Sequence, residues 1–212
     1  MAAPRRDWLE WHRAYDDPGT PHSRRLLVVQ RCIREALDLA PAGPLRVVSM
    51  CAGEGRDLLG ALEDHPRRAD VHARLVELDE QILSIARASF AAAGIDAELV
   101  AADAALTDAY LGAVPAHLVL VCGVFGNIPD ADVARTIAHL PGFCAPAATV
   151  VWTRHRRPPD LTPRIREWFA RAGFDEIVFE APPDERFGVG AHRLRTHPVP
   201  LTCGVHLFDF VR

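Results

Sequence analysis

The sequence predicts an α/β protein built on a mostly parallel sheet with helices on both faces. Short apolar runs alternate with segments of helical periodicity from residue 45 onward, which is the pattern of strands joined by covering helices. The first apolar run, Leu45–Met50, leads through a turn of small residues into a helical pattern. With 212 residues, 49% of them hydrophobic, the chain has enough apolar material for one sizeable core.

The turn after this first strand reads Cys51-Ala52-Gly53-Glu54-Gly55. Gly53 and Gly55 can adopt backbone angles closed to other residues, and they let a ligand approach the main chain. The helix that follows presents unpaired N–H groups in front of the turn. Strand, glycine turn and helix in this order are typical of a nucleotide-binding unit, but the turn alone also fits an ordinary strand-to-helix connection.

The segment before the first strand has two helical patterns. Trp8, Trp11 and Tyr15 fall on one face of the first, and a second helix is predicted to begin with Ser23 as its N-cap and to end before Pro41. We expect residues 1–44 to form a helical cap. It either packs on the main domain or closes over a ligand as a lid.

The main domain is predicted to span residues 45–212. After the first strand, apolar runs predict further strands at 71–78, 97–101, 118–121, 149–153, 174–180 and 205–211. Helical patterns lie between most of them, one of them with Asp130 as its predicted N-cap, and glycines follow two of these patterns at 94 and 173.

Small or acidic residues follow three of these strands in succession. The glycine turn follows the first strand, Asp79 the second and Asp103 the third. In a parallel sheet these positions meet at the carboxyl edge, where ligands bind. Asp79 comes 24 residues after Gly55, close to the interval at which an acid accepts hydrogen bonds from ribose hydroxyls. Asp103 would accept from the amino group of adenine.

On these residues the chain resembles the class I S-adenosylmethionine (SAM)-dependent methyltransferases. Their first motif matches residues 47–55, their ribose-binding acid falls on Asp79, and their adenine-facing acid falls on Asp103 with Ala104 beside it. The resemblance implies a Rossmann-like, seven-stranded sheet in the order 3-2-1-4-5-7-6 with an antiparallel final pair. It also implies SAM as cofactor. The predicted cofactor-binding residues are Cys51, Ala52, Gly53, Gly55, Asp79, Asp103, Ala104 and Cys122.

Three positions depart from the family pattern. Ser49 stands where an acid is usual, Cys51 replaces the first glycine, and His117 replaces a frequent aspartate. Glu54 or Glu77 could supply the charge that Ser49 lacks.

For the methyl acceptor we expect a pocket made by the loop 122–127, the segment after the fifth strand and the N-terminal helices. Its candidate catalytic residues are Tyr15, Asn127 and His155, with Phe125 as an apolar wall; methyl transfer often needs only alignment, so a dedicated base is optional. The net charge of −4 gives no general attraction for nucleic acid or anionic membrane. The sequence Asn127-Ile128-Pro129-Asp130 also lacks the motif of base-methylating enzymes. We therefore expect a small-molecule acceptor, with no nucleic-acid or membrane partner.

Two other functions stay open. A SAM-binding regulator would need the same residues, because they report binding and not turnover. A nicotinamide-dependent oxidoreductase fits less well, since Leu58 stands at the third glycine of its fingerprint. No spacing of His, Asp, Glu or Cys predicts a metal site. Unpaired cysteines and the absence of a hydrophobic leader or membrane span predict a cytosolic protein.

Overall fold

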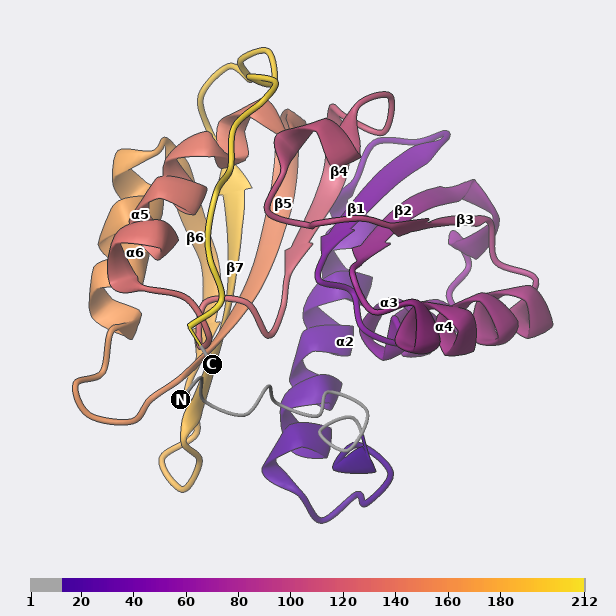
Figure 1. Ribbon diagram of the computed structural model, residues 1–212, viewed down its shortest axis with the longest axis horizontal. Coiled ribbons are helices and arrows are strands. Elements are labelled where there is room, and N and C mark those ends of the chain that lie inside the picture. Colours follow the sequence, from indigo (N-terminus) through magenta and orange to yellow (C-terminus); the bar gives the residue numbers. More distant parts are fainter. Residues whose placement is uncertain (1–12, 212) are drawn as a thin grey trace, which may run out of the picture.

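The computed structural model describes residues 13–211 and contains a seven-stranded sheet in the order β3-β2-β1-β4-β5-β7-β6 (Figure 1). The strands are β1 (Leu45–Met50), β2 (Val71–Glu77), β3 (Ala97–Ala101), β4 (Ala116–Val121), β5 (Cys144–His155), β6 (Phe174–Glu180) and β7 (Phe187–Leu194). Strands β1 to β5 are parallel, whereas β7 pairs antiparallel with both β5 and β6. The predicted fold class and strand order are confirmed.

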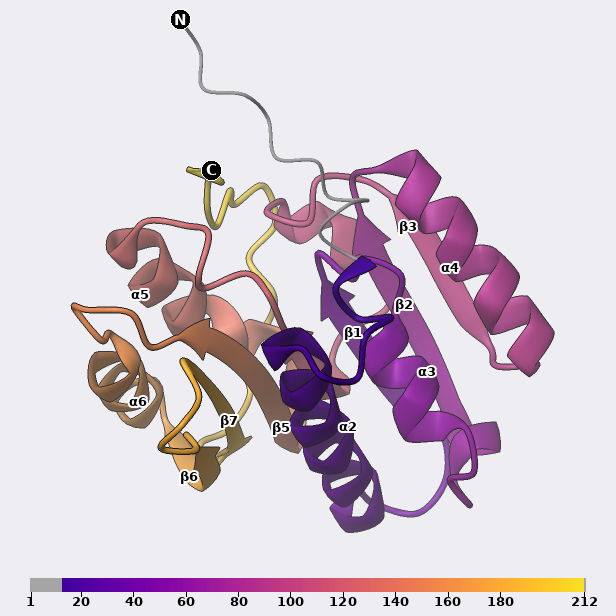
Figure 2. The same ribbon diagram turned by 90° about the horizontal axis from the view of Figure 1, so that it is seen from below.

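The helices cover both faces of this sheet (Figure 2). They are α2 (Pro21–Leu39), α3 (Arg56–Leu62), α4 (Glu80–Ala93), α5 (Asp130–His139) and α6 (Thr162–Arg171), with short 3-10 turns at Arg68–Asp70, Thr107–Tyr110 and Leu140–Gly142. One buried cluster joins the sheet to α5 and α6, and a second joins its other face to α2, α3 and α4. Among residues 13–211, no helix has both the length and the apolar character needed to cross a bilayer.

The predicted last strand is wrong. The seventh strand is β7, Phe187–Leu194, and residues 205–211 carry only an isolated bridge between Leu106 and His206. Glycine conceals the true strand in the sequence. A Cβ at Gly190 would lie 2.4 Å from the Trp152 side chain, so glycine is needed where a β-branched residue would signal a strand.

The start of α2 also differs from the prediction. The helix begins at Pro21, and its N-cap is Thr20, whose side chain accepts from the Ser23 backbone N–H. Proline favours the first helical position because its fixed φ suits the helix and its missing N–H is not needed there. Ser23 therefore lies inside the first turn. Likewise, Asp130 is the first residue of α5 and not its cap, which is Pro129.

Helix α2 is an integral part of the core. Its buried residues Val29, Ile33 and Leu37 belong to the same cluster as sheet residues such as Val47 and Val151. A lid role for the predicted cap therefore rests on what precedes α2. Trp8 and Trp11 lie outside the described residues, and Tyr15 lies in a turn.

Candidate functional site

The turn between β1 and α3 has an unusual backbone. Cys51, Gly53 and Gly55 all have positive φ, at 51°, 58° and 69°. Glycine is also required for packing at residue 55, since a Cβ there would lie 2.5 Å from the Phe90 ring and 2.8 Å from Leu75. The main chain therefore turns sharply at the carboxyl end of β1 and leaves little side-chain bulk there.

Glu77, the last residue of β2, lies against this turn. One carboxylate oxygen, Oε2, accepts from the Gly53 N–H at 2.9 Å. The other, Oε1, accepts from the N–H groups of Leu78 and Asp79 at 2.9 and 3.0 Å. Sequence reasoning named Glu77 only as a substitute for the missing acid at Ser49. The sequence feature that indicates this role is the position of Glu77 at the end of its strand, from which a side chain can reach the neighbouring turn.

Asp79, the predicted ribose-binding acid, is the N-cap of α4. Its Oδ1 accepts from the N–H groups of Gln81 and Ile82 at 2.9 and 3.3 Å. An N-cap aspartate satisfies N–H groups that the helix leaves unpaired. The structure thus gives Asp79 a helix-capping role and places Glu77, two residues earlier, beside the glycine turn.

Asp103 and Ala104 follow β3 on the same edge of the sheet. Asp103 Oδ1 accepts from the Ala105 N–H at 2.9 Å, and its Oδ2 lies 3.2 Å from His206 Nε2. Ala104 is buried, and its carbonyl accepts from the Tyr110 hydroxyl at 2.9 Å.

The groups after β1, β2 and β3 converge electrostatically. Burial, together with the carboxylates of Glu77 and Asp103, raises the pKa of the Cys51 thiol. Burial raises the pKa of the Tyr110 hydroxyl too, and the same carboxylates add to the effect. The thiol and the phenol stay neutral at pH 7, and the acceptors at this edge are the carboxylates of Glu77 and Asp103.

Tyr15 lies near Cys122, which follows β4. Its hydroxyl accepts from Arg25 Nη2 at 2.7 Å, and burial raises its pKa. The charge of Asp57, in the first turn of α3, raises the pKa values of both Tyr15 and Cys122 in addition to burial. Burial raises the pKa of Asp57 itself to about 6. Tyr15 and Cys122 therefore lie around the same two charged side chains, Arg25 and Asp57.

The loop after β4, which holds Asn127, packs against His155, the last residue of β5. The Asn127 amide nitrogen donates to the Gly123 carbonyl at 2.6 Å, and Gly123 N–H donates to Thr153 Oγ1 at 2.8 Å. A Cβ at Gly126 would lie 3.3 Å from His155 Cδ2, which shows that the imidazole packs on this loop.

Phe125 does not form the predicted pocket wall. It is fully buried and packs at 6.1 Å from the Trp152 ring. The backbone explains this. The Asn127 side-chain amide donates to the Gly123 carbonyl and its backbone N–H donates to the Val124 carbonyl, which holds the loop as a compact turn and directs the Phe125 ring into the core.

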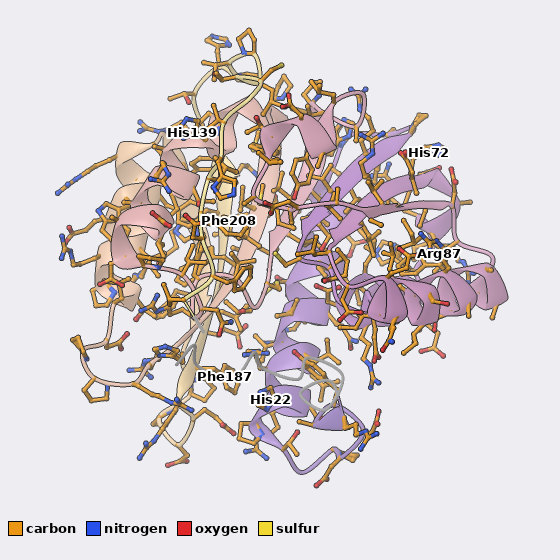
Figure 3. The ribbon with its side chains drawn as sticks, viewed as in Figure 1. His22, His72, Arg87, His139, Phe187 and Phe208 are labelled. Atoms are coloured by element: carbon orange, nitrogen blue, oxygen red, sulfur yellow. The ribbon has the colours of Figure 1, made fainter. Side chains whose placement is uncertain are left out.

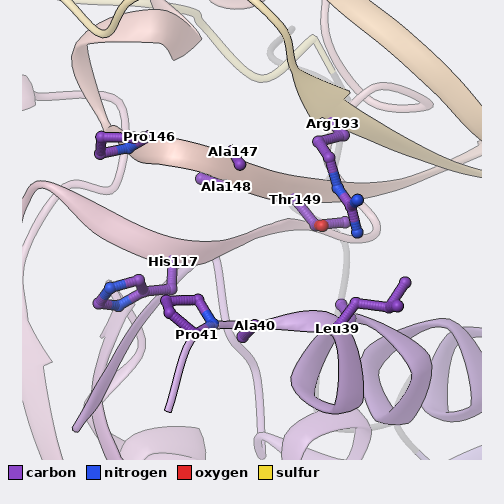
Figure 4. Close-up of a pocket in the computed structure, with 10 residues that line it drawn as sticks. Leu39, Ala40, Pro41, His117, Pro146, Ala147, Ala148, Thr149 and Arg193 are labelled. Carbon is purple, nitrogen blue, oxygen red and sulfur yellow. The ribbon is translucent and has the colours of Figure 1, made fainter. Parts of the chain in front are cut away.

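Metal ligands are not grouped in the described part of the chain: no three His, Cys, Asp or Glu residues there could hold one ion. A small pocket lies at the opposite edge of the sheet, at the amino end of β4 (Figure 4). His117 lines it and accepts from the Arg46 N–H at 3.0 Å, and burial with the charges of Arg46 and Arg67 lowers its pKa. This pocket is separate from the candidate site.

Comparison with known proteins gives agreement in structure and not in sequence. No protein-family model and no curated protein matches the chain. Magnesium protoporphyrin IX methyltransferase from Synechocystis, solved with bound SAM, superimposes with a TM-score of 0.66 at 15% identity, over 89% of this chain and 91% of that one. An O-methyltransferase family protein from Burkholderia thailandensis gives 0.66 at 16% identity, covering 84% of this chain.

The chain spans 57% of the length of the Burkholderia protein. A third structure, called a possible exported protein, comes from Bordetella parapertussis; its TM-score is 0.63 at 19% identity, over 82% of this chain and 68% of that one. These superpositions agree with the strand order and with the antiparallel β6–β7 pair. The chain has the fold of the class I SAM-dependent methyltransferases.

Proposed function

We propose that this protein is a SAM-dependent methyltransferase that acts on a small molecule. One observation carries the proposal. The glycine turn after β1, the Glu77 carboxylate after β2 and the Asp103 carboxylate after β3 converge at the carboxyl edge of the sheet. These carboxylate acceptors suit a nucleoside, which offers ribose hydroxyls and a base amino group as donors. The Synechocystis structure with bound SAM supports the choice of ligand.

Each carboxylate has a distinct proposed role. Glu77 accepts from a ribose hydroxyl through Oε2, which accepts from Gly53 N–H and keeps one acceptor site, and it lies on the turn that the ligand would approach. Asp103 accepts from the adenine amino group. Asp79 stays a candidate for ribose binding through its second oxygen, because its first caps α4. Cys51, Ala52, Gly53 and Gly55 provide the close backbone surface, and Ala104 and Cys122 line its two sides.

The acceptor is proposed to lie beyond Cys122, between the loops after β4 and β5 and the segment around Tyr15. Bound SAM supplies a methyl group activated by a positively charged sulfur. What the protein contributes is alignment of the acceptor and exclusion of water. Tyr15 has a raised pKa and stays protonated, so it acts through hydrogen bonding and not as a base.

His155 is the proposed residue to receive the acceptor's proton where one must leave, and Asn127 is proposed to shape the loop that faces the acceptor. The net charge of −4 supports a small acceptor over a nucleic acid, and we propose a cytosolic location.

A turnover assay separates this proposal from its alternatives. The full-length protein is incubated with SAM carrying a labelled methyl group and a panel of small hydroxyl, amine, thiol and carbon acceptors. Acceptor-dependent, equimolar formation of labelled product and S-adenosylhomocysteine (SAH) is expected. The Glu77→Gln variant serves as the binding-deficient control.

Tight SAM binding without turnover on any acceptor would favour a regulatory SAM-binding protein. Binding of NAD with no response to SAM would favour an oxidoreductase and overturn the proposal.

A further inference from the structure

The segment after β7 runs alongside the strands (Figure 1) and bonds to the loops that follow β3 and β4. We call residues 203–211 the C-terminal strap; it is the yellow segment that ends at C in Figure 1. Leu207 and Phe208 anchor it in the core at 0% and 2% exposure, and Figure 3 labels Phe208 beside the strands. The strap is therefore fixed by packing and is not a loose tail.

Backbone hydrogen bonds tie the strap to both loop regions of the candidate site. On the adenine side, Thr107 N–H donates to the Val205 carbonyl at 3.0 Å and Leu207 N–H donates to the Ala105 carbonyl at 2.9 Å. On the acceptor side, Val211 N–H donates to the Asn127 carbonyl at 3.0 Å. These bonds hold the residue between Val205 and Leu207 in one position.

That residue is His206, which reaches Asp103. Its Nε2 lies 3.2 Å from Asp103 Oδ2, and its Nδ1 lies 4.0 Å from Asp209 Oδ1. The other Asp103 oxygen accepts from Ala105 N–H. Donors from two separate segments therefore fix the plane of this carboxylate, while both side chains remain partly exposed, at 41% and 45%.

We infer that His206 is a positioning residue for base recognition: it holds the Asp103 carboxylate in the orientation that accepts from the adenine amino group. The inference rests on the proposed function. Each carboxylate oxygen can accept two hydrogen bonds, so the bonds from His206 and Ala105 leave acceptor sites for an incoming amine. Without His206 the carboxylate would rotate about its last bond and would be held only by its own loop.

The test compares two nucleosides that differ at the amino group. Full-length wild type and His206→Ala are titrated by calorimetry with SAH and with S-inosylhomocysteine, which carries a carbonyl oxygen in place of that amino group. His206→Ala is expected to lose about fivefold in SAH affinity, the equivalent of about 1 kcal/mol. Affinity for the inosine compound should change less than about twofold, so discrimination between the two shrinks.

Two further variants control for general damage. His206→Gln keeps a side-chain donor and should recover part of the discrimination. His197→Ala removes an exposed histidine that also follows β7, and it should leave both affinities unchanged. Melting temperatures of all variants show whether each remains folded.

Equal losses for both nucleosides, no loss for either, a gain in SAH affinity, or a wild type that does not discriminate would each overturn the inference. If the wild type binds SAH, such a result leaves the proposed function standing. If it binds neither nucleoside, the proposed function fails first and the inference fails with it.

Discussion

The two halves of the candidate site are held in different ways. In the cofactor half, at the ends of β1, β2 and β3, glycines with positive φ and carboxylates bonded to backbone N–H groups set the geometry. In the acceptor half, at the ends of β4 and β5, the loops rest on a buried aromatic cluster around Trp152, which packs against Phe125, Phe169 and Phe179. The geometry of the cofactor half therefore depends on local chain conformation, and that of the acceptor half depends on packing between distant segments.

The largest expected effect comes from breaking the cofactor half at Gly55. In Gly55→Ala the new Cβ meets Phe90 and Leu75 at 2.5 and 2.8 Å, at a φ of 69°. Backbone strain and overpacking together should lower the free energy of unfolding by about 3–4 kcal/mol. Denaturant unfolding measures this change.

Gly94→Ala is the matched control. Gly94 has a similar φ of 63°, and a Cβ there would meet nothing within 4 Å. Gly94→Ala should therefore lower the free energy of unfolding by the backbone strain alone, about 1–2 kcal/mol. Equal losses for the two variants would contradict the packing role of Gly55.

The acceptor half depends on packing around a buried histidine, so its folding stability should depend on pH. His192 is buried at 1% exposure, accepts from Trp152 Nε1 at 3.1 Å and stacks on Phe169 at 4.3 Å. Burial lowers its pKa to about 4, although the charge of Glu176 raises it. Arg166 donates a hydrogen bond to Glu176, and its positive charge lowers the pKa of His192 further. Below the ordinary histidine pKa, the unfolded chain binds a proton that the folded chain does not.

Folding stability should therefore fall as the pH drops from about 6.5 to about 4, by about 2–3 kcal/mol from this residue. Asp57 acts in the opposite direction, since its raised pKa lets the folded state bind a proton first. His192→Gln, which keeps an acceptor for Trp152, should flatten the decline, and His197→Gln at an exposed position should not. An unchanged slope in His192→Gln would refute this account.

Within the cofactor half, a pair of isosteric changes tests which acid binds the ribose. Glu77→Gln should weaken SAH binding about tenfold or more, because a charged acceptor beside the glycine turn is lost. Asp79→Asn retains an N-cap and should change affinity by about twofold or less. Calorimetry measures both, and the reverse order of effects would return the ribose role to Asp79.

The smallest effects are expected in the acceptor half, from Tyr15→Phe and Asn127→Ala. Each removes one hydrogen bond, to Arg25 and to the Gly123 carbonyl respectively, worth about 1 kcal/mol. Turnover with an acceptor found in the panel should fall about fivefold, while SAH affinity stays within about twofold. If turnover is unaffected by both changes, the acceptor pocket has been placed at the wrong loops.

The same contrast explains which features the sequence could predict. The convergence of Gly53, Gly55 and Asp103 follows from chain-local patterns, because parallel strands bring their carboxyl ends to one edge. The strand order follows from the resemblance to the methyltransferase family and not from these patterns. The choice between Glu77 and Asp79 needed the structure. Both acids lie at the end of the same strand, and only the hydrogen bonds show that Glu77 reaches the turn and that Asp79 caps a helix.

Packing between distant segments could not be predicted from local sequence patterns. Gly190 and Trp152 are complementary across two strands, so neither residue alone signals that residues 187–194 form β7. Leu207 and Phe208 resemble strand residues but serve as anchors of the strap. A phenylalanine in this loop is typical of an apolar pocket wall, yet the compact loop around Phe125 directs its ring into the core.

The most direct test of the central claim is calorimetric titration of the full-length protein with SAH, and separately with NAD. We expect saturable binding of SAH with a stoichiometry of one, binding weakened about tenfold or more in Glu77→Gln, and no binding of NAD. Binding of NAD together with the absence of any response to SAH would contradict the claim that the carboxyl edge of β1, β2 and β3 is a SAM site.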